Sequence, residues 1–258
     1  MPNNRDIVIT PEMLNGIAEI DAFNGAWTGG AVKLSADDLR VMRRVATIES
    51  VGSSNRIEGN RMTDTEIEAL FANINRQSFA TRDEQEVAGY SDVINTIFEN
   101  YASIPLSENY IKQLHKILLN YSDKDTRHRG EYKKDSNRVA AFDANGNEIG
   151  SIFETATPFD TPRLMSETVK WTNDALADKF FHPIIAVGVF VIHFLSIHPF
   201  TDGNGRFVAR IDCYADAEKR IYIYAICIYG VYYRSNQGRI LSCITWHTKN
   251  HLGRQDQL

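Results

Sequence analysis

The sequence contains little cysteine, which limits how the chain can be stabilised. Its 258 residues include three cysteines, Cys213, Cys227 and Cys243. Their number is odd and their spacing has no pair typical of a metal site, which argues against a disulfide-stapled scaffold and against a zinc module. We therefore expect a protein of the reducing cytoplasm.

The sequence also lacks an excess of basic residues and a long hydrophobic run. Its net charge of −5 gives no broad basic surface for a nucleic acid. The longest apolar run before residue 198 covers residues 183–197 and is too short to span a bilayer comfortably. No signal peptide opens the chain. We expect neither nucleic acid nor a membrane as partner, and we interpret 183–197 as a buried helix with His193 in the core.

Most of the remaining pattern is helical. Capping-box patterns at Ser35–Asp38, Thr63–Glu66 and Thr81–Glu84 predict three helix starts. Pro162 is typical of a first helical turn and predicts another start. We predict a mainly α fold in one large domain or two small ones.

Most of the candidate catalytic and binding residues lie in residues 198–210, His-Pro-Phe-Thr-Asp-Gly-Asn-Gly-Arg-Phe-Val-Ala-Arg. If a helix begins near the two glycines, its first N–H groups lack intrahelical partners and point at an anion. Arg206 and Arg210 are four residues apart, so on a helix they share one face, where two guanidinium groups can bind successive phosphates. The stretch therefore predicts a phosphate site whose cradle is formed by Gly203, Asn204 and Gly205.

Two further side chains complete the predicted site. Asp202 places a hard oxygen ligand where Mg²⁺ could bridge phosphates. His198 precedes a proline that ends the incoming helix, which leaves its ring at the edge of the cradle as a candidate general base.

Position for position, this stretch resembles the signature His-Pro-Phe-x-Asp/Glu-Gly-Asn-Gly-Arg-x-x-Arg of the Fic family. The resemblance implies a Fic-like helical bundle that transfers AMP from ATP to a protein hydroxyl. It implies that His198 takes the hydroxyl proton, that Asp202 holds Mg²⁺ on the α- and β-phosphates, and that Arg206 and Arg210 bind the outer phosphates. The related Doc kinases carry lysine in place of the second glycine, so Gly205 favours nucleotidyl transfer.

The same resemblance also suggests a function for a second segment, which contains Ser54, Glu58 and Gly59. Ser54 and Glu58 lie four apart, so on a helix they share one face, and Gly59 is a typical helix stop. Taken alone, the pattern also fits a capped surface helix with a solvated glutamate. The segment resembles the inhibitory motif Ser/Thr-x-x-x-Glu-Gly/Asn of the Fic family, which implies that Glu58 pairs with Arg210 and occupies the place of the ATP γ-phosphate.

Between residues 129 and 158 the pattern becomes extended. The Asn145-Gly146 dipeptide is a strong two-residue turn signal between residues 138–142 and 148–153, so we predict a β-hairpin. The resemblance implies that this 138–153 hairpin is a flap over the active site that holds the target's backbone by strand addition. A surface hairpin without function is the alternative.

We divide the chain into an N-terminal helical region with the inhibitory motif (1–105), a Fic core (106–215) and a tail of uncertain structure (216–258). Residues 221–233 are rich in β-forming residues, nearly uncharged and poorly matched to a bundle helix. One hypothesis is that the reading frame shifts after about residue 211. A single clean frame in the source DNA with a well-packed tail would exclude it.

The leading hypothesis is an autoinhibited protein adenylyltransferase that moves AMP from Mg²⁺-ATP to a Ser, Thr or Tyr hydroxyl of a target protein. Two alternatives stay open: a phosphodiesterase that removes AMP from a modified protein, and a catalytically silent nucleotide-binding module. The sequence names no target and leaves the oligomeric state open, with a homo-oligomer among the alternatives.

Overall fold

The computed structural model describes residues 7–28, 35–57, 59–72, 79–100, 105–142 and 148–207. Predictions that concern Glu58, Arg210 and the tail lie outside the described residues. Within them the fold is mainly helical, as predicted, with one pair of strands. The elements are α1 (Pro11–Thr28), α2 (Ala36–Ile57), α3 (Asp64–Ala72), α4 (Arg82–Asn100), α5 (Glu108–Leu118), β1 (Arg138–Phe142), β2 (Glu148–Glu154), α6 (Thr161–Asp178) and α7 (Pro183–Ile197).

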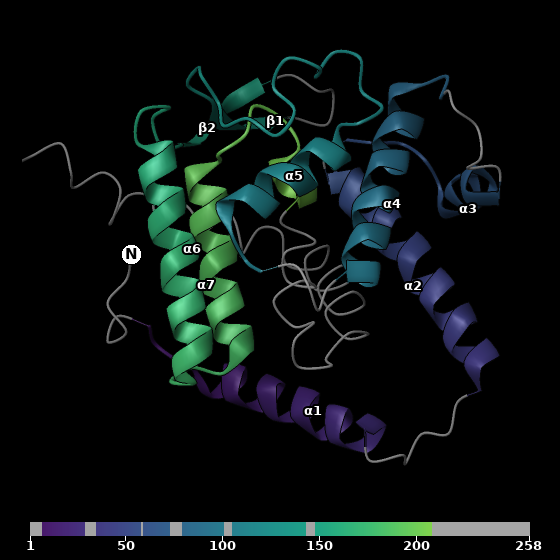
Figure 1. Cartoon of the computed structure of the whole chain (residues 1–258), viewed down its shortest axis with the longest axis vertical. Helices are drawn as coiled ribbons and strands as arrows, with labels where there is room; N and C mark the ends of the chain where they lie inside the picture. Colours follow the sequence, from purple (N-terminus) through teal and green to yellow (C-terminus); the bar gives the residue numbers. More distant parts are fainter. Residues whose placement is uncertain are drawn as a thin grey trace, which may run out of the picture.

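The helices form two groups that α5 joins. Helices α6 and α7 pack side by side, and α4 packs against α2 and α5 (Figure 1). Helix α5 also contacts α6, so it lies between the two groups, while α3 packs on α2 and α4. Helix α1 crosses the end of the α6–α7 pair where α7 begins (Figure 1). This arrangement brings the loop that follows α7 beside the start of α4 and the end of α5.

The predicted helix starts are confirmed by their hydrogen bonds. The Thr63 hydroxyl accepts from the Glu66 amide at 3.3 Å, and the Glu66 carboxylate accepts from the Thr63 amide at 2.8 Å. The same reciprocal pair joins Ser35 with Asp38, and Thr81 with Glu84. Each pair satisfies two backbone donors that a helix start would otherwise leave unpaired.

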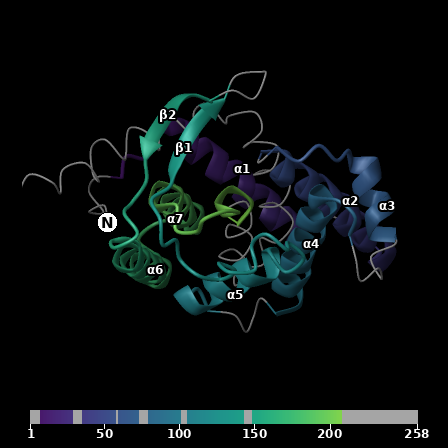
Figure 2. The same cartoon turned by 90° about the horizontal axis from the view of Figure 1, so that it is seen from above.

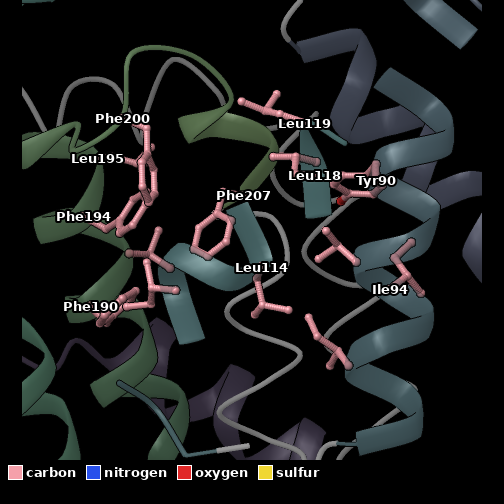
Figure 3. Packing of buried hydrophobic residues seen from close by; sticks show 14 of the residues in the cluster. Tyr90, Ile94, Leu114, Leu118, Leu119, Phe190, Phe194, Leu195, Phe200 and Phe207 are labelled. Carbon is pink, nitrogen blue, oxygen red and sulfur yellow. The ribbon is translucent and has the colours of Figure 1, made fainter. Parts of the chain in front are cut away.

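The main hydrophobic core lies between α4, α5 and α7 (Figure 3). Helix α7 is apolar on most of its faces, and burial of Phe190, Phe194 and Ile197 explains why that sequence can form a stable helix in the bundle centre. Among the described residues, no helix is both long enough and apolar enough to cross a membrane. The 183–197 prediction is confirmed, and His193 is 8 % exposed, as expected of a core residue.

The contact between α4 and α5 depends on Gly89. A Cβ atom at this position would lie 2.0 Å from the carbonyl oxygen of Leu118, far inside van der Waals contact. The absence of a side chain therefore lets the two backbones meet. This close approach brings the start of α4 and the end of α5 to the same side of the molecule as the end of α7.

The two strands pair antiparallel, with Arg138 opposite Glu154 and Phe142 opposite Glu148. Register shifts occur at Val139/Ala140 and at Ala141/Phe142. The pair lies at the end of the bundle where α7 terminates (Figures 1 and 2). The predicted hairpin strands are thus present.

Candidate active site

His198 follows directly on α7, and its backbone reverses the chain. It caps the helix with φ 52° and ψ 62°, in the left-handed region, and its N–H donates to the Phe194 carbonyl at 2.8 Å. A non-glycine residue in this region is strained, so neighbouring contacts must hold it there. They do so through Asn137, whose side-chain amide donates to the carbonyls of His198 at 3.2 Å and Phe200 at 2.9 Å.

The His198 ring is held in its neutral form. Burial lowers its pKa to about 4, and the positive charge of Lys133 acts in the same direction. The Leu195 backbone carbonyl and the Asp202 carboxylate oppose this shift more weakly. Atom Nδ1 is buried and makes no hydrogen bond of ordinary geometry with the described residues. A neutral imidazole keeps one nitrogen lone pair and can therefore accept a proton.

Asn204 fixes the turn that follows His198. It is 1 % exposed, its Oδ1 accepts from the Phe200 N–H at 2.9 Å, and its Nδ2 donates to the Phe200 carbonyl at 2.7 Å. One amide side chain therefore satisfies both backbone groups of Phe200. The ring of Phe200 packs beside Phe194 and Phe207 in the core (Figure 3). Both the ring of Phe200 and its backbone groups therefore anchor the loop to the core.

A buried histidine that the sequence reasoning missed supports the same loop. His115, on α5, is fully buried and stacks on Phe200 with ring centroids 3.7 Å apart. Its Nδ1 accepts from the Gly130 N–H and its Nε2 donates to the Asp202 carbonyl, each at 3.0 Å. These partners require the neutral ring, and burial lowers its pKa to about 4. His115 directly follows Leu114 of the apolar stripe of α5. This position was the signal in the sequence that could have indicated its burial.

Asp202 lies at the open side of the loop, with its side chain 32 % exposed. Its Oδ1 accepts from the Gly203 N–H at 2.7 Å, and its Oδ2 pairs with Arg82 of α4 at 3.0 Å. Among the described residues no group of three or more potential metal ligands occurs. A single accessible carboxylate fits Mg²⁺, which keeps several waters and takes further ligands from substrate phosphates. Asp202 is therefore the residue that would hold this ion.

A new helix begins directly after Asp202. Gly203 has φ 78°, and the Phe207 N–H donates to its carbonyl at 2.9 Å, which closes the first turn. Within the described part of the chain, the amides of Asn204 and Gly205 have no backbone acceptor. Gly203, Asn204 and Gly205 thus lie at the start of a helix, as expected, and phosphate binding by their amides stays a prediction.

Arg206 points into the protein. It is 1 % exposed, and its guanidinium lies 3.2 Å from Glu86 of α4 and 3.4 Å from Asp202. In this arrangement its cationic group ties the loop to α4. Phosphate binding by Arg206 stays a prediction, and Arg210, its expected companion, lies outside the described residues.

The residues around the predicted inhibitory segment reach the same part of α4. Ser54 is 2 % exposed, and its hydroxyl accepts from the Tyr90 hydroxyl at 2.5 Å. Helix α2 ends at Ile57, and Gly59 has φ 91°, in agreement with the predicted helix stop. Asn60 donates to Glu86 at 3.3 Å, the carboxylate that also faces Arg206. Asn60, which follows the predicted inhibitory segment, and Arg206, which belongs to the predicted phosphate site, therefore both contact Glu86. Glu86 is a residue that the sequence reasoning did not identify.

Comparisons with known proteins agree with this geometry. The Fic/DOC family profile matches residues 105–212. A Fic-domain-containing signaling protein from Bacteroides thetaiotaomicron has a similar structure, with a TM-score of 0.64, 22 % identity, and coverage of 87 % of this chain and 95 % of the other. A Fic family protein from Desulfovibrio desulfuricans gives a TM-score of 0.66 at 22 % identity, with coverage of 98 % and 77 %.

A fragment of Fic-1 from C. elegans gives a TM-score of 0.60 at 19 % identity, with coverage of 94 % of this chain and 70 % of that fragment. No curated protein matches the chain significantly. The family profile covers the loop from His198 to Arg206 together with α5, α6 and α7 but not α4, and the structural matches share the fold. The chain is therefore a Fic-domain protein, and residues 105–212 belong to the Fic/DOC family.

Proposed function

We propose that this protein transfers AMP from Mg²⁺-ATP to a hydroxyl group of a target protein and that its N-terminal region restrains the activity. Fic proteins generally transfer nucleotide-derived groups. The observation that carries the proposal is the loop from His198 to Arg206. There, a neutral imidazole, an accessible carboxylate and the first turn of a helix lie within nine consecutive residues anchored to the core.

His198 would act as the general base. The target hydroxyl loses its proton to a ring nitrogen as its oxygen forms a bond to the α-phosphorus of ATP. The bond from this phosphorus to the bridging oxygen breaks, and pyrophosphate leaves. The proposal is supported by the neutral ring, because an already protonated imidazole cannot accept the proton. Asn137 keeps the ring in place by holding the backbone on both sides of Pro199.

Asp202 and the helix start would bind the nucleotide. Mg²⁺ held by Asp202 would neutralise part of the phosphate charge. The Asn204 and Gly205 amides carry the partial positive charge of a helix amino terminus, which favours an anion. We further propose that Arg206 and Arg210 contribute to the binding of the outer phosphates. For Arg206 this requires that a phosphate compete with the carboxylates of Glu86 and Asp202.

We assign residues 1–105 to a regulatory region, 106–215 to the catalytic core and 216–258 to a tail. Glu58 would inhibit by pairing with Arg210. The proposal is supported by the position of Asn60, which is bonded to the same carboxylate as Arg206. The 138–153 hairpin would receive an extended segment of the target as an added strand.

The test uses the full chain with Glu58→Gly, incubated with a host lysate and ATP labelled at the α-phosphate. We expect protein-bound label that is absent with His198→Ala. A parallel reaction with ATP labelled at the γ-phosphate should give none, because pyrophosphate leaves. Label from the γ-phosphate alone would identify phosphate transfer and overturn the proposal. Release of AMP from a previously modified protein without ATP would instead support the phosphodiesterase.

A further inference from the structure

Lys133 is a buried lysine whose three ammonium protons are all used. It is 3 % exposed, and its Nζ donates to the Asn137 side chain at 2.7 Å, the Thr155 hydroxyl at 2.8 Å and the Ile197 carbonyl at 2.9 Å. Its backbone N–H also donates to the Pro199 carbonyl at 2.8 Å. An ammonium group has three donors, so this geometry saturates it.

The three acceptors come from three different places in the fold. Asn137 directly precedes β1, Thr155 directly follows β2, and Ile197 is the last residue of α7, next to His198. The contacts continue from there, since the Thr155 hydroxyl also lies 2.7 Å from the Asn137 carbonyl oxygen. One ammonium group therefore connects both strand bases of the hairpin to the residue before His198.

This arrangement is costly, because a buried charge loses its hydration. No carboxylate of the described residues forms an ion pair with Lys133, and burial lowers its pKa to about 8. Three neutral oxygens replace the lost hydration of the ammonium group, and one of them is a carbonyl at the negative end of α7. A neutral apolar side chain of similar length would avoid this cost but would leave the three oxygens without their donor, so the ammonium group serves to hold these three segments together.

We propose that Lys133 is a positioning residue that fixes the hairpin and the His198 loop to each other, so that a peptide bound along the hairpin meets the His198 ring in one register. The inference rests on the proposed AMP transfer and concerns how its two protein parts are aligned. Proximity effects are steep, since a misplacement of about 1 Å can cost on the order of 100-fold in rate.

The same residue acts on the His198 ring. Two charged groups influence this ring within the described part of the chain: Lys133 favours the neutral form, and Asp202 opposes it. Loss of the ammonium charge should therefore raise the pKa of His198. This shift gives a readout that a purely space-filling role of Lys133 would not produce.

The experiment compares Lys133→Met, Lys133→Arg and Lys134→Met in the full chain with Glu58→Gly. Lys134 is the adjacent, exposed lysine and serves as the matched control. We expect Lys133→Met to lower kcat by about 100-fold, with the Kd of a non-hydrolysable Mg²⁺-ATP analogue changed by less than about twofold. Arginine should restore part of the rate, and Lys134→Met should change neither quantity.

The second measurement is the NMR titration of the His198 ring without nucleotide. In Lys133→Met we expect its pKa to rise above that of the parent protein. A folded Lys133→Met with unchanged kcat and an unchanged His198 titration would overturn the inference. If no Glu58→Gly protein transfers AMP, the proposed function fails, while the titration still decides whether Lys133 acts on His198.

A third variant covers the case in which Lys133→Met does not fold. Thr155→Val keeps the ammonium and removes one of its acceptors. We expect faster amide hydrogen exchange at Lys133, whose N–H is bonded to Pro199, and at His198, whose N–H ends α7. Exchange that is accelerated only around residue 155 would show that the hairpin base and the loop are not coupled, and would also overturn the inference.

Discussion

Arg82 and Asp202 are 120 residues apart in the sequence, and their side chains form an ion pair at 3.0 Å. Arg82 also pairs with Glu86 at 2.8 Å. Because Arg206 lies between Glu86 and Asp202, the four side chains form a closed ring of alternating charge. The amino-terminal turn of α4 is thereby joined to the loop that carries His198. The ring also places two arginines, Arg82 and Arg206, beside the carboxylate that we assign to Mg²⁺.

The first prediction follows from this competition. Arg82→Gln should strengthen binding of Mg²⁺ together with an ATP analogue, because the ion pair between Arg82 and Asp202 then no longer has to break before Asp202 binds the ion. Arg82 is 54 % exposed, so the pair is screened by solvent and the effect should be at most about fivefold in affinity. Isothermal titration calorimetry measures it.

The matched control for this measurement is Arg163→Gln. Arg163 lies in the first turn of α6, is 47 % exposed and also bridges two carboxylates, those of Asp160 and Glu167. It should leave Mg²⁺ binding unchanged. Equal affinities of Arg82→Gln and Arg163→Gln would show that Arg82 does not compete at Asp202.

The sequence predicted the elements that depend on local pattern. The bounds of the buried run at 183–197 follow from its continuous apolar character and from a proline at each end. The capping pairs are local side-chain hydrogen bonds, and the Asn145-Gly146 signal correctly separated two strands. Each of these features is decided within a few residues.

The parts that the sequence did not predict depend on residues far apart. Arg206 was expected to face a ligand, and its inward orientation becomes evident only when α4 brings Glu86 against it. Asn204 was assigned to the cradle through its backbone amide, and the use of its side-chain amide on the backbone of Phe200 was not predicted. Lys133 and His115 look like ordinary polar residues in their own segments, because burial by other elements leaves no local signal.

The second prediction concerns Glu58. Arg210 can bind a carboxylate or a phosphate bidentately, but not both in one geometry. Charge-assisted hydrogen bonds contribute about 1.5–3 kcal/mol, so Glu58→Gly should improve productive ATP binding by about 10- to 150-fold. The rate of AMP transfer at limiting ATP measures this gain. Arg210→Ala should abolish activity even with Glu58→Gly, and equal activity of the wild type and Glu58→Gly at saturating Mg²⁺-ATP would contradict inhibition.

The third prediction concerns pH. With the pKa of His198 lowered to about 4, only about 1 % of the rings are protonated at pH 6, whereas an ordinary histidine with a pKa of about 6.5 would be mostly protonated. The rate of AMP transfer should therefore stay nearly constant from pH 7 to pH 6, where Lys133 with its pKa of about 8 is still mostly charged, and on the acid side it should fall only below pH 5. An acid limb near pH 6.5 would contradict the assignment of a neutral, buried base.

The lowered pKa of His198 also predicts how the free energy of unfolding changes with pH. Between pH 6.5 and pH 4 the unfolded chain binds a proton at His198 that the folded protein does not bind, so the free energy of unfolding should decrease as pH falls through this window. Urea unfolding of His198→Gln at pH 7 and pH 5 tests it. This variant should lose less stability over the window than the wild type does.

The last prediction separates the structural role of Asn204 from a role in nucleotide binding. Asn204→Ala leaves the buried N–H of Phe200 without its side-chain acceptor, while the Phe200 carbonyl keeps the Asn137 amide as a donor, so the unsatisfied N–H should cost about 1–3 kcal/mol. Asn100→Ala removes a side chain that also donates to a backbone carbonyl but is exposed on α4, so it should cost much less. Urea unfolding measures both. If Asn204→Ala is as stable as Asn100→Ala and only loses affinity for ATP, then the amide serves the nucleotide, and the anchoring of the His198 loop must come from Phe200 and Asn137 alone.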